Sequence, residues 1–136
     1  MKLSEQQLAF LNEIRFGVLA TVNADGSPQQ TVMWYLPVDG DTILMNTKKG
    51  RVKDKNLGRD ARVSLCVEEG QKYVAMRGTI SVDDDADHGQ ETMKAVTTRY
   101  EGAEVAERQM KEMYSKQHRI TLTLKIDSVD THGFEN

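Results

Sequence analysis

The sequence predicts a mainly β fold, a small closed or nearly closed antiparallel barrel with added helices. Six segments rich in β-branched and apolar residues follow one another at hairpin spacing, with turn residues between them. Helical periodicity is confined to the N-terminus, one short basic segment and one late segment. Helices therefore do not alternate with strands, as a doubly wound α/β fold requires. The 136 residues suit a single domain over 1–136.

The first half of the chain is expected to hold a helix and three strands. Ser4 and Gln7 have the spacing of a capping box, and apolar residues recur behind them at roughly helical spacing as far as Ile14. This pattern predicts a helix that closes one end of the β-core. Two Asp-Gly pairs mark turns between segments rich in Val, Thr and Leu. The three segments are 16–23, 29–36 and 42–46, and we expect them to form an antiparallel meander.

The second half is expected to add three strands and two helical segments. A short helix is predicted over 51–57, with Gly58 as its C-terminal stop. Gly78 lies inside a strand pattern, which predicts a bulge or a close backbone approach. A late helical segment is interrupted at Gly102, and its acidic start suits a helix N-terminus better than a metal site. The strands are expected at 61–68, 73–82 and 119–129, and the late helical segment at 83–117.

The stretch 44–62 carries the strongest functional signal. It contains seven basic residues and two acidic ones, in a chain whose net charge is −3. Lys48, Lys49 and Arg51 lie where a helix is expected to begin, and a helix N-terminus has free N–H groups and a partial positive charge. Cations do not stabilise that end of a helix, but with the N–H groups they make an anion site. We therefore expect a phosphate contacted first by Arg51 and Lys53; the alternative is a solvated basic helix.

Other candidate residues have two interpretations each. Trp34 could hold a planar ring beside the anion site or pack in the core. Arg77, which shares a strand face with Tyr73, could meet an anionic substrate or lie on the barrel surface. The three histidines are scattered, and neither metal-ligand spacing nor a glycine-rich phosphate loop is present. A phosphate site without acid–base groups favours a bound cofactor that carries the reaction.

Composition limits the expected partners and location. A net charge of −3 argues against general nucleic-acid binding. The single cysteine, Cys66, excludes an internal disulfide framework and a multi-cysteine zinc site. The sequence shows no apolar segment long enough for a signal peptide or a membrane span. A cytoplasmic protein without nucleic-acid or membrane partners is therefore expected.

Three segments together resemble the pyridoxamine 5′-phosphate oxidase-like, flavin-binding split-barrel superfamily. They are GVLATVNADGSPQQTVMWYL, LMNTKKGRVKDKNLGRDARVSLCV and YVAMRGTISV, which cover most of residues 16 to 82. Within the superfamily the chain looks most like the small deazaflavin-dependent oxidoreductases that use coenzyme F-420. It lacks the arginine- and histidine-containing C-terminal motif of the oxidases that make pyridoxal phosphate, so vitamin B6 oxidation is not expected.

The resemblance implies a six-stranded antiparallel split β-barrel of Greek-key type that forms a homodimer, with two cofactors in clefts between the subunits. The implied reaction is hydride transfer from reduced coenzyme F-420 to a small conjugated substrate. FMN is the alternative cofactor, and a non-catalytic flavin or deazaflavin carrier is the alternative function. The resemblance implies contacts to the phosphate from Lys48, Arg51 and Lys53, to the ring from Thr31, Val32, Met33, Met45, Asn46 and Thr47, and from the partner subunit by Tyr73 or Arg77. Catalytic residues and the substrate stay open.

Overall fold

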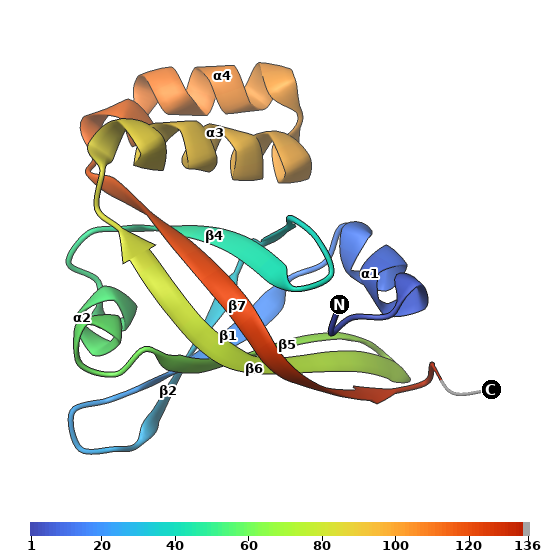
Figure 1. The fold of residues 1–136 in the computed structure, drawn as a ribbon. Coiled ribbons are helices and arrows are strands. Elements are labelled where there is room, and N and C mark those ends of the chain that lie inside the picture. The colour runs from blue at the N-terminus through green and yellow to red at the C-terminus, as the bar shows by residue number, and fades with distance from the viewer. Residues whose placement is uncertain (135–136) are drawn as a thin grey trace.

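A computed structural model describes residues 1–134 of the 136-residue chain. Its strands are β1 Gly17–Val22, β2 Pro28–Met33, β3 Leu36–Pro37, β4 Thr42–Lys48, β5 Arg62–Glu69, β6 Lys72–Asp83 and β7 Arg119–His132. They form one antiparallel sheet in the order β2-β1-β5-β6-β7-β4-β3, which curls into a half-barrel (Figure 1). The predicted class, a mainly β split barrel with added helices, is confirmed.

The helices begin where the capping residues predict. The Ser4 hydroxyl accepts a hydrogen bond from the Gln7 N–H, and the Gln7 side chain accepts one from the Ser4 N–H. Asp85 caps the late helical segment, which breaks into two helices at Gly102. None of the helices within residues 1–134 is long and apolar enough to cross a membrane. The helices are α1 Glu5–Asn12, α2 Val52–Arg59, α3 Ala86–Glu101, α4 Ala103–Glu112 and the 3-10 helix η1 Tyr114–Lys116.

The expected strand number and the meander were wrong. The segment expected as one strand over 29–36 forms β2 and then, after a break at Trp34 and Tyr35, the two-residue β3, so the sheet has seven strands. β4 pairs with β3 and β7 and not with β2, so the three expected strands form two separate hairpins, β1–β2 and β3–β4, in place of one continuous meander. The physical reason is that β7 offers β4 seven residues of pairing. The α2 helix also continues past Gly58 to Arg59.

The core lies inside the curled sheet, and α1 covers one end of it (Figure 1). Phe10 and Leu11 of α1 pack there with the buried apolar residues of the strands. Gly78 lies at the register shift between β6 and β7, and a Cβ atom on it would lie 1.9 Å from the Lys125 carbonyl oxygen. The predicted bulge and the close backbone approach are therefore both present.

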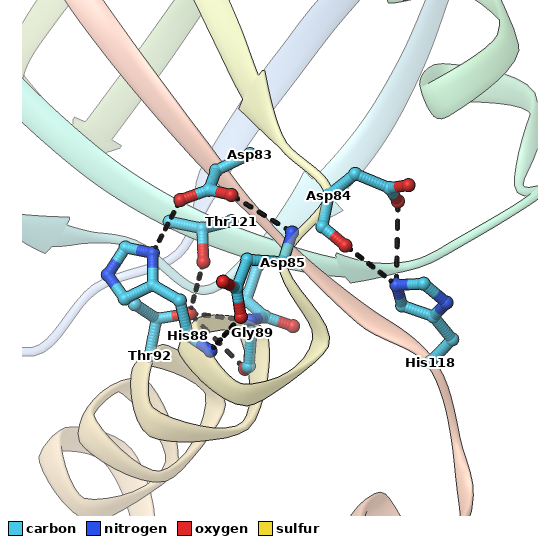
Figure 2. A network of polar contacts seen from close by, with 9 residues as sticks. Asp83, Asp84, Asp85, His88, Gly89, Thr92, His118 and Thr121 are labelled. Atoms are coloured by element: carbon cyan, nitrogen blue, oxygen red, sulfur yellow. Dashed lines mark hydrogen bonds and ion pairs between the residues drawn. The ribbon is translucent and has the colours of Figure 1, made fainter.

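The helices α3 and α4 lie side by side outside the half-barrel, and α3 contacts β4 and β7 (Figure 1). Figure 2 shows the polar contacts at the junction of β6 with α3. His88 Nδ1 lies 2.8 Å from the Asp83 carboxylate, and His118 Nε2 lies 2.9 Å from the Asp84 carbonyl oxygen. Lys49 Nζ donates to the Asp84 carboxylate at 2.7 Å. These contacts attach the start of α3 to the adjacent ends of β4 and β7.

Candidate functional site

A cavity of about 350 Å³ lies where β2, β4, the start of α2, α3 and the start of β7 meet. The cavity brings together segments from the first, middle and last thirds of the chain. Seven of the residues predicted to bind the cofactor line it: Thr31, Val32, Met33, Asn46, Thr47, Arg51 and Lys53. β2 and β4 are not neighbours in the sheet, so the fold, and not strand pairing between them, places these residues around one space.

Four predicted residues are not among those that line the cavity. The Met45 side chain is fully buried in the core. Lys48 is exposed at the end of β4. Tyr73 and Arg77 are exposed on β6, where Arg77 forms an ion pair with Asp130 at 3.3 Å. The predicted role of Tyr73 and Arg77 concerns the cavity of a second subunit.

Two cations in the cavity wall are buried. The side chains of Lys53 and Arg119 are only 5% and 8% exposed. Among residues 1–134, the Lys53 ammonium group has no hydrogen bond or ion pair, and neither cation has a carboxylate partner. The unpartnered nitrogens of both side chains keep access to the cavity space, and an anionic ligand there would supply the missing counter-charge.

The pKa values of these cations follow from the same geometry. Burial lowers the pKa of Lys53, and the neighbouring charges of Arg51 and Arg119 lower it further. Burial also lowers the pKa of Arg119, with a contribution from Arg51. The three cations therefore act on one another, which means that they share one electrostatic neighbourhood. A bound phosphate would relieve this repulsion.

The start of α2 is built to turn Lys53 inward. Arg51 is the N-cap residue and makes no side-chain capping bond. Asn56 lies three residues after Lys53, on the same helix face. Its amide donates to Thr21 Oγ1 and to Asn23 Oδ1, both at 3.0 Å, which attaches this face to β1. Lys53 is thus held against the barrel, while the exposed Arg51 stays at the cavity rim.

Arg119, at the start of β7, was not predicted from the sequence. Its Nε donates to Asn46 Oδ1 at 2.9 Å, and its Nη1 donates to Gln117 Oε1 at 3.0 Å. The Tyr114 ring lies 5.2 Å from the guanidinium carbon. In the sheet, Arg119 is the pairing partner of Lys48. The pairing of Arg119 with Lys48 could have indicated this residue, but the sequence does not show that β7 lies beside β4.

The rest of the cavity wall is largely apolar and aromatic. Met93 and Val96 of α3 contribute to it, together with Met113 and Trp34. The Trp34 ring stacks on Tyr100, with centroids 4.9 Å apart and planes 7° apart. Trp34 therefore lines the cavity and stacks on Tyr100, outside the hydrophobic core of the half-barrel, and its contact with a planar ring stays a prediction.

Among residues 1–134, no Asp, Glu or His lines the cavity. The single cysteine, Cys66, lies on β5 outside the wall, and burial, together with the charge of Glu68, raises the pKa of its thiol. A raised pKa disfavours the reactive thiolate. The arrangement can bind an anion and a flat apolar group, but it offers no carboxylate or imidazole for acid–base catalysis.

Comparisons with known proteins identify a family and similar structures. The pattern of the family described as pyridoxamine 5′-phosphate oxidase matches residues 3–133. A biliverdin reductase from Mycobacterium tuberculosis (strain CDC 1551 / Oshkosh), named as dependent on reduced coenzyme F-420, is 30% identical over 88 residues. Those residues are 63% of this chain and 64% of the relative, so the match spans less than two thirds of the relative's length.

Solved structures share the fold. A conserved hypothetical protein from Mycobacterium tuberculosis has a TM-score of 0.80 at 30% identity, and the match covers 96% of this chain and 84% of that chain. A structure named as an F-420 reductase has a TM-score of 0.74 at 23% identity, covers 94% of this chain and 98% of its own, and supports the fold alone. Because the family pattern spans almost the whole described chain, the protein belongs to the pyridoxamine 5′-phosphate oxidase family.

Proposed function

We propose that the protein is an oxidoreductase that uses reduced coenzyme F-420 for hydride transfer to a small conjugated substrate. The observation that carries this proposal is the pair of buried cations, Lys53 and Arg119, which have no acidic partner in a cavity that is otherwise largely apolar and aromatic. The similarity to a biliverdin reductase named as dependent on reduced F-420 supports the choice of cofactor.

The residues present fit a flavin-type cofactor with a phosphate. Arg51, Lys53 and Arg119 would hold the phosphate, since an anionic phosphate matches a group of cations that lacks carboxylates among the described residues. The end of β2 and the Trp34 ring would contact the ring system, because they supply a backbone edge and an aromatic surface beside the cations. When bound, the reduced deazaflavin supplies a hydride.

The chain itself would bind, orient and keep water away. Met93, Val96 and Met113 present apolar surface to the cavity, which disfavours water beside a bound ring. The cations favour negative charge in the cavity. Since no Asp, Glu or His of the described part of the chain lines the wall, we assign positioning and electrostatics to the protein and leave the hydride chemistry to the cofactor.

We also propose that the functional unit is a homodimer with the cofactor in a cleft between the subunits. In that arrangement Tyr73 or Arg77 of one subunit would complete the cavity of the other. Their exposure on β6, away from the cavity of their own chain, is compatible with this role.

The second candidate is an FMN-dependent oxidoreductase. The match to the pyridoxamine 5′-phosphate oxidase family favours it, and the same cations would accept the FMN phosphate. A non-catalytic carrier of either cofactor is the third candidate, because a wall without acid–base side chains is sufficient for binding.

Titrations with coenzyme F-420 and FMN separate the three candidates. The chain has a single tryptophan, Trp34, in the cavity wall, so its fluorescence reports binding at this site. We expect F-420 to bind more tightly than FMN, and reduced F-420 to be oxidised in the presence of an enone, a tetrapyrrole or a nitro compound. Tight FMN binding without F-420 binding would favour the second candidate, and binding without turnover would favour the carrier.

Replacement of Lys53 tests the phosphate assignment. Lys53→Ala removes the most buried cation, and we expect the Kd for the cofactor to rise about 10- to 100-fold, the usual range for losing a charged hydrogen-bond partner. Lys55→Ala, an exposed lysine on the same helix, is the matched control and should leave Kd within about threefold. An unchanged Kd in the Lys53 variant would contradict the assignment.

A further inference from the structure

Arg119 is held in one orientation by neutral groups alone. Asn46 accepts from Nε, Gln117 accepts from Nη1, and the Tyr114 ring lies 5.2 Å from the guanidinium carbon. Within residues 1–134 the remaining nitrogen, Nη2, has no hydrogen-bond partner. A guanidinium has five N–H donors in a planar fork, so this arrangement fixes the plane and leaves donors for another acceptor.

The orientation of the Asn46 amide is determined by its other neighbours. Its Nδ2 donates to the Gly89 carbonyl oxygen at 2.9 Å and to Thr92 Oγ1 at 2.8 Å. A carbonyl oxygen can only accept, so the NH2 group must face α3 and the oxygen must face Arg119. Asn46 therefore joins the first turns of α3 to the guanidinium.

The contact between α3 and β7 is unusually close at this point. A Cβ atom on Gly89 would lie 1.8 Å from the Arg119 carbonyl oxygen, so the helix can approach only because residue 89 has no side chain. Beside it, the Thr92 and Thr121 hydroxyls are 2.7 Å apart (Figure 2). Both the backbone and the side chain of Arg119 thus depend on where α3 is seated.

We propose that Arg119 is an anion-binding residue of the cavity and that Asn46 is its positioning residue, so that the seating of α3 on the sheet sets the affinity for a phosphate group. The inference rests on the proposed function, because it concerns the same cavity. It adds a residue from the far end of the sequence to the basic stretch before and within α2, and it gives the α3–α4 helix pair a role in binding.

The test compares each cofactor with its phosphate-free form. The Kd values for FMN and riboflavin, and for coenzyme F-420 and the phosphate-free deazaflavin riboside, are measured by Trp34 fluorescence. The phosphate advantage is the Kd of the phosphate-free form divided by the Kd of the phosphate-bearing form. In Arg119→Gln this ratio is expected to fall about 10- to 100-fold, because the ring contacts remain while a charged partner is lost. Arg108→Gln removes the same charge from an exposed position on α4 and should keep the wild-type advantage.

Arg119→Lys provides a second, charge-conserving variant. We expect an intermediate loss of the phosphate advantage, because lysine lacks the planar fork of the guanidinium.

Asn46→Asp tests the positioning role. The new carboxylate would pair with the Arg119 guanidinium and compete with the phosphate, so the phosphate advantage is expected to fall about tenfold or more. Asn12→Asp, which adds the same charge at an exposed position, should have no such effect. Because the Asn46 amide also donates to Gly89 and Thr92, a lower melting temperature is expected in either case, and a purely structural role of Asn46 would instead weaken binding of both forms equally.

The outcomes separate this inference from the proposed function. If Arg119→Gln weakens FMN and riboflavin equally, the inference is overturned and Arg119 is removed from the phosphate contacts, whereas the proposed function is tested separately by cofactor binding and turnover in the wild-type protein. If the wild-type protein binds neither cofactor, the proposed function fails. The inference is then tested by the effect of inorganic phosphate on the melting temperature. A phosphate-dependent rise in melting temperature in wild type and Arg108→Gln, but not in Arg119→Gln, would support it; no rise would overturn it. An unchanged phosphate advantage in Asn46→Asp would remove Asn46 from the proposal.

Discussion

Tyr35 and Lys53 are both buried polar residues, but only Tyr35 has a hydrogen-bond partner. The Tyr35 hydroxyl donates to the Leu11 carbonyl oxygen at 2.9 Å, which ties the break between β2 and β3 to α1. Tyr35 therefore stabilises the fold. Lys53 lacks any such partner, and a residue that is buried at a free-energy cost is more readily explained by a ligand than by stability.

Tyr35→Phe is predicted to lower the free energy of unfolding by about 1 kcal/mol near neutral pH, the net contribution of one hydrogen bond. Burial raises the pKa of Tyr35 to about 12, so between about pH 10 and 12 the unfolded chain loses this proton before the folded protein does. The stabilisation is fully present below about pH 10 and is lost as the pH rises toward 12. The difference between wild type and variant should therefore shrink over that interval.

Urea unfolding at a series of alkaline pH values measures this difference directly. Tyr73→Phe, at an exposed position on β6, is the control for general effects of losing a tyrosine hydroxyl. A difference between wild type and Tyr35→Phe that stays constant from neutral pH to about pH 12 would contradict the assignment.

At the scale of elements, the helices α2 and α3 each contain a glycine, and the two have opposite surroundings. A Cβ atom on Gly58 of α2 would have no atom within 4 Å, whereas one on Gly89 of α3 would overlap the Arg119 carbonyl oxygen. Gly58 therefore only lowers the helix propensity of α2, and the helix continues past it to Arg59. Gly89 is required for α3 to approach β7.

Gly89→Ala is predicted to destabilise the protein by about 2 kcal/mol or more, because backbone must move to admit the methyl group. Gly58→Ala is the matched control and should stabilise the protein by about 0.5–1 kcal/mol, the helix-propensity difference between the two residues. Chemical denaturation of both variants provides the measurement. Equal effects of the two substitutions would show that α3 does not depend on close contact with β7.

At the scale of the whole molecule, the side of the sheet formed by β1, β5, β6 and β7 has a second hollow, of about 580 Å³. Arg62, Arg77 and Asp127 are among the residues that line it, so this surface carries both signs of charge. Surfaces with both signs of charge can be self-complementary about a two-fold axis. The proposed homodimer would use this side of the sheet to bring β6 of one subunit to the cavity of the other.

Sedimentation equilibrium is predicted to give roughly twice the chain mass of 15.3 kDa. Arg77→Glu reverses one charge of this mixed surface and is expected to raise the dimer dissociation constant about tenfold or more. Lys94→Glu, on an exposed position of α3, is the control and should leave the association unchanged. A monomer at all concentrations would contradict the shared-cleft arrangement.

Local sequence features determined much of the fold before any tertiary contact was known. The Ser4 capping box, the break at Gly102 and the bulge at Gly78 were all predicted and are all present. Each is signalled by residue types at or near one position, although the bulge at Gly78 also brings that residue against the Lys125 backbone of β7. The basic residues Arg51 and Lys53 also lie in the cavity wall, because a short turn and helix carry them there as one unit.

Only the tertiary structure decided which strands pair with each other and which cation lies beside Lys53 in the cavity wall. The predicted meander was wrong because turn residues report where a strand ends, not which distant strand it pairs with, and β4 pairs with β7. Arg119 reaches the cavity through that pairing, and its orientation comes from Asn46 and α3. Contacts between residues far apart in the chain are selected by burial and loop closure across the whole molecule, and these leave no periodic signal in the sequence.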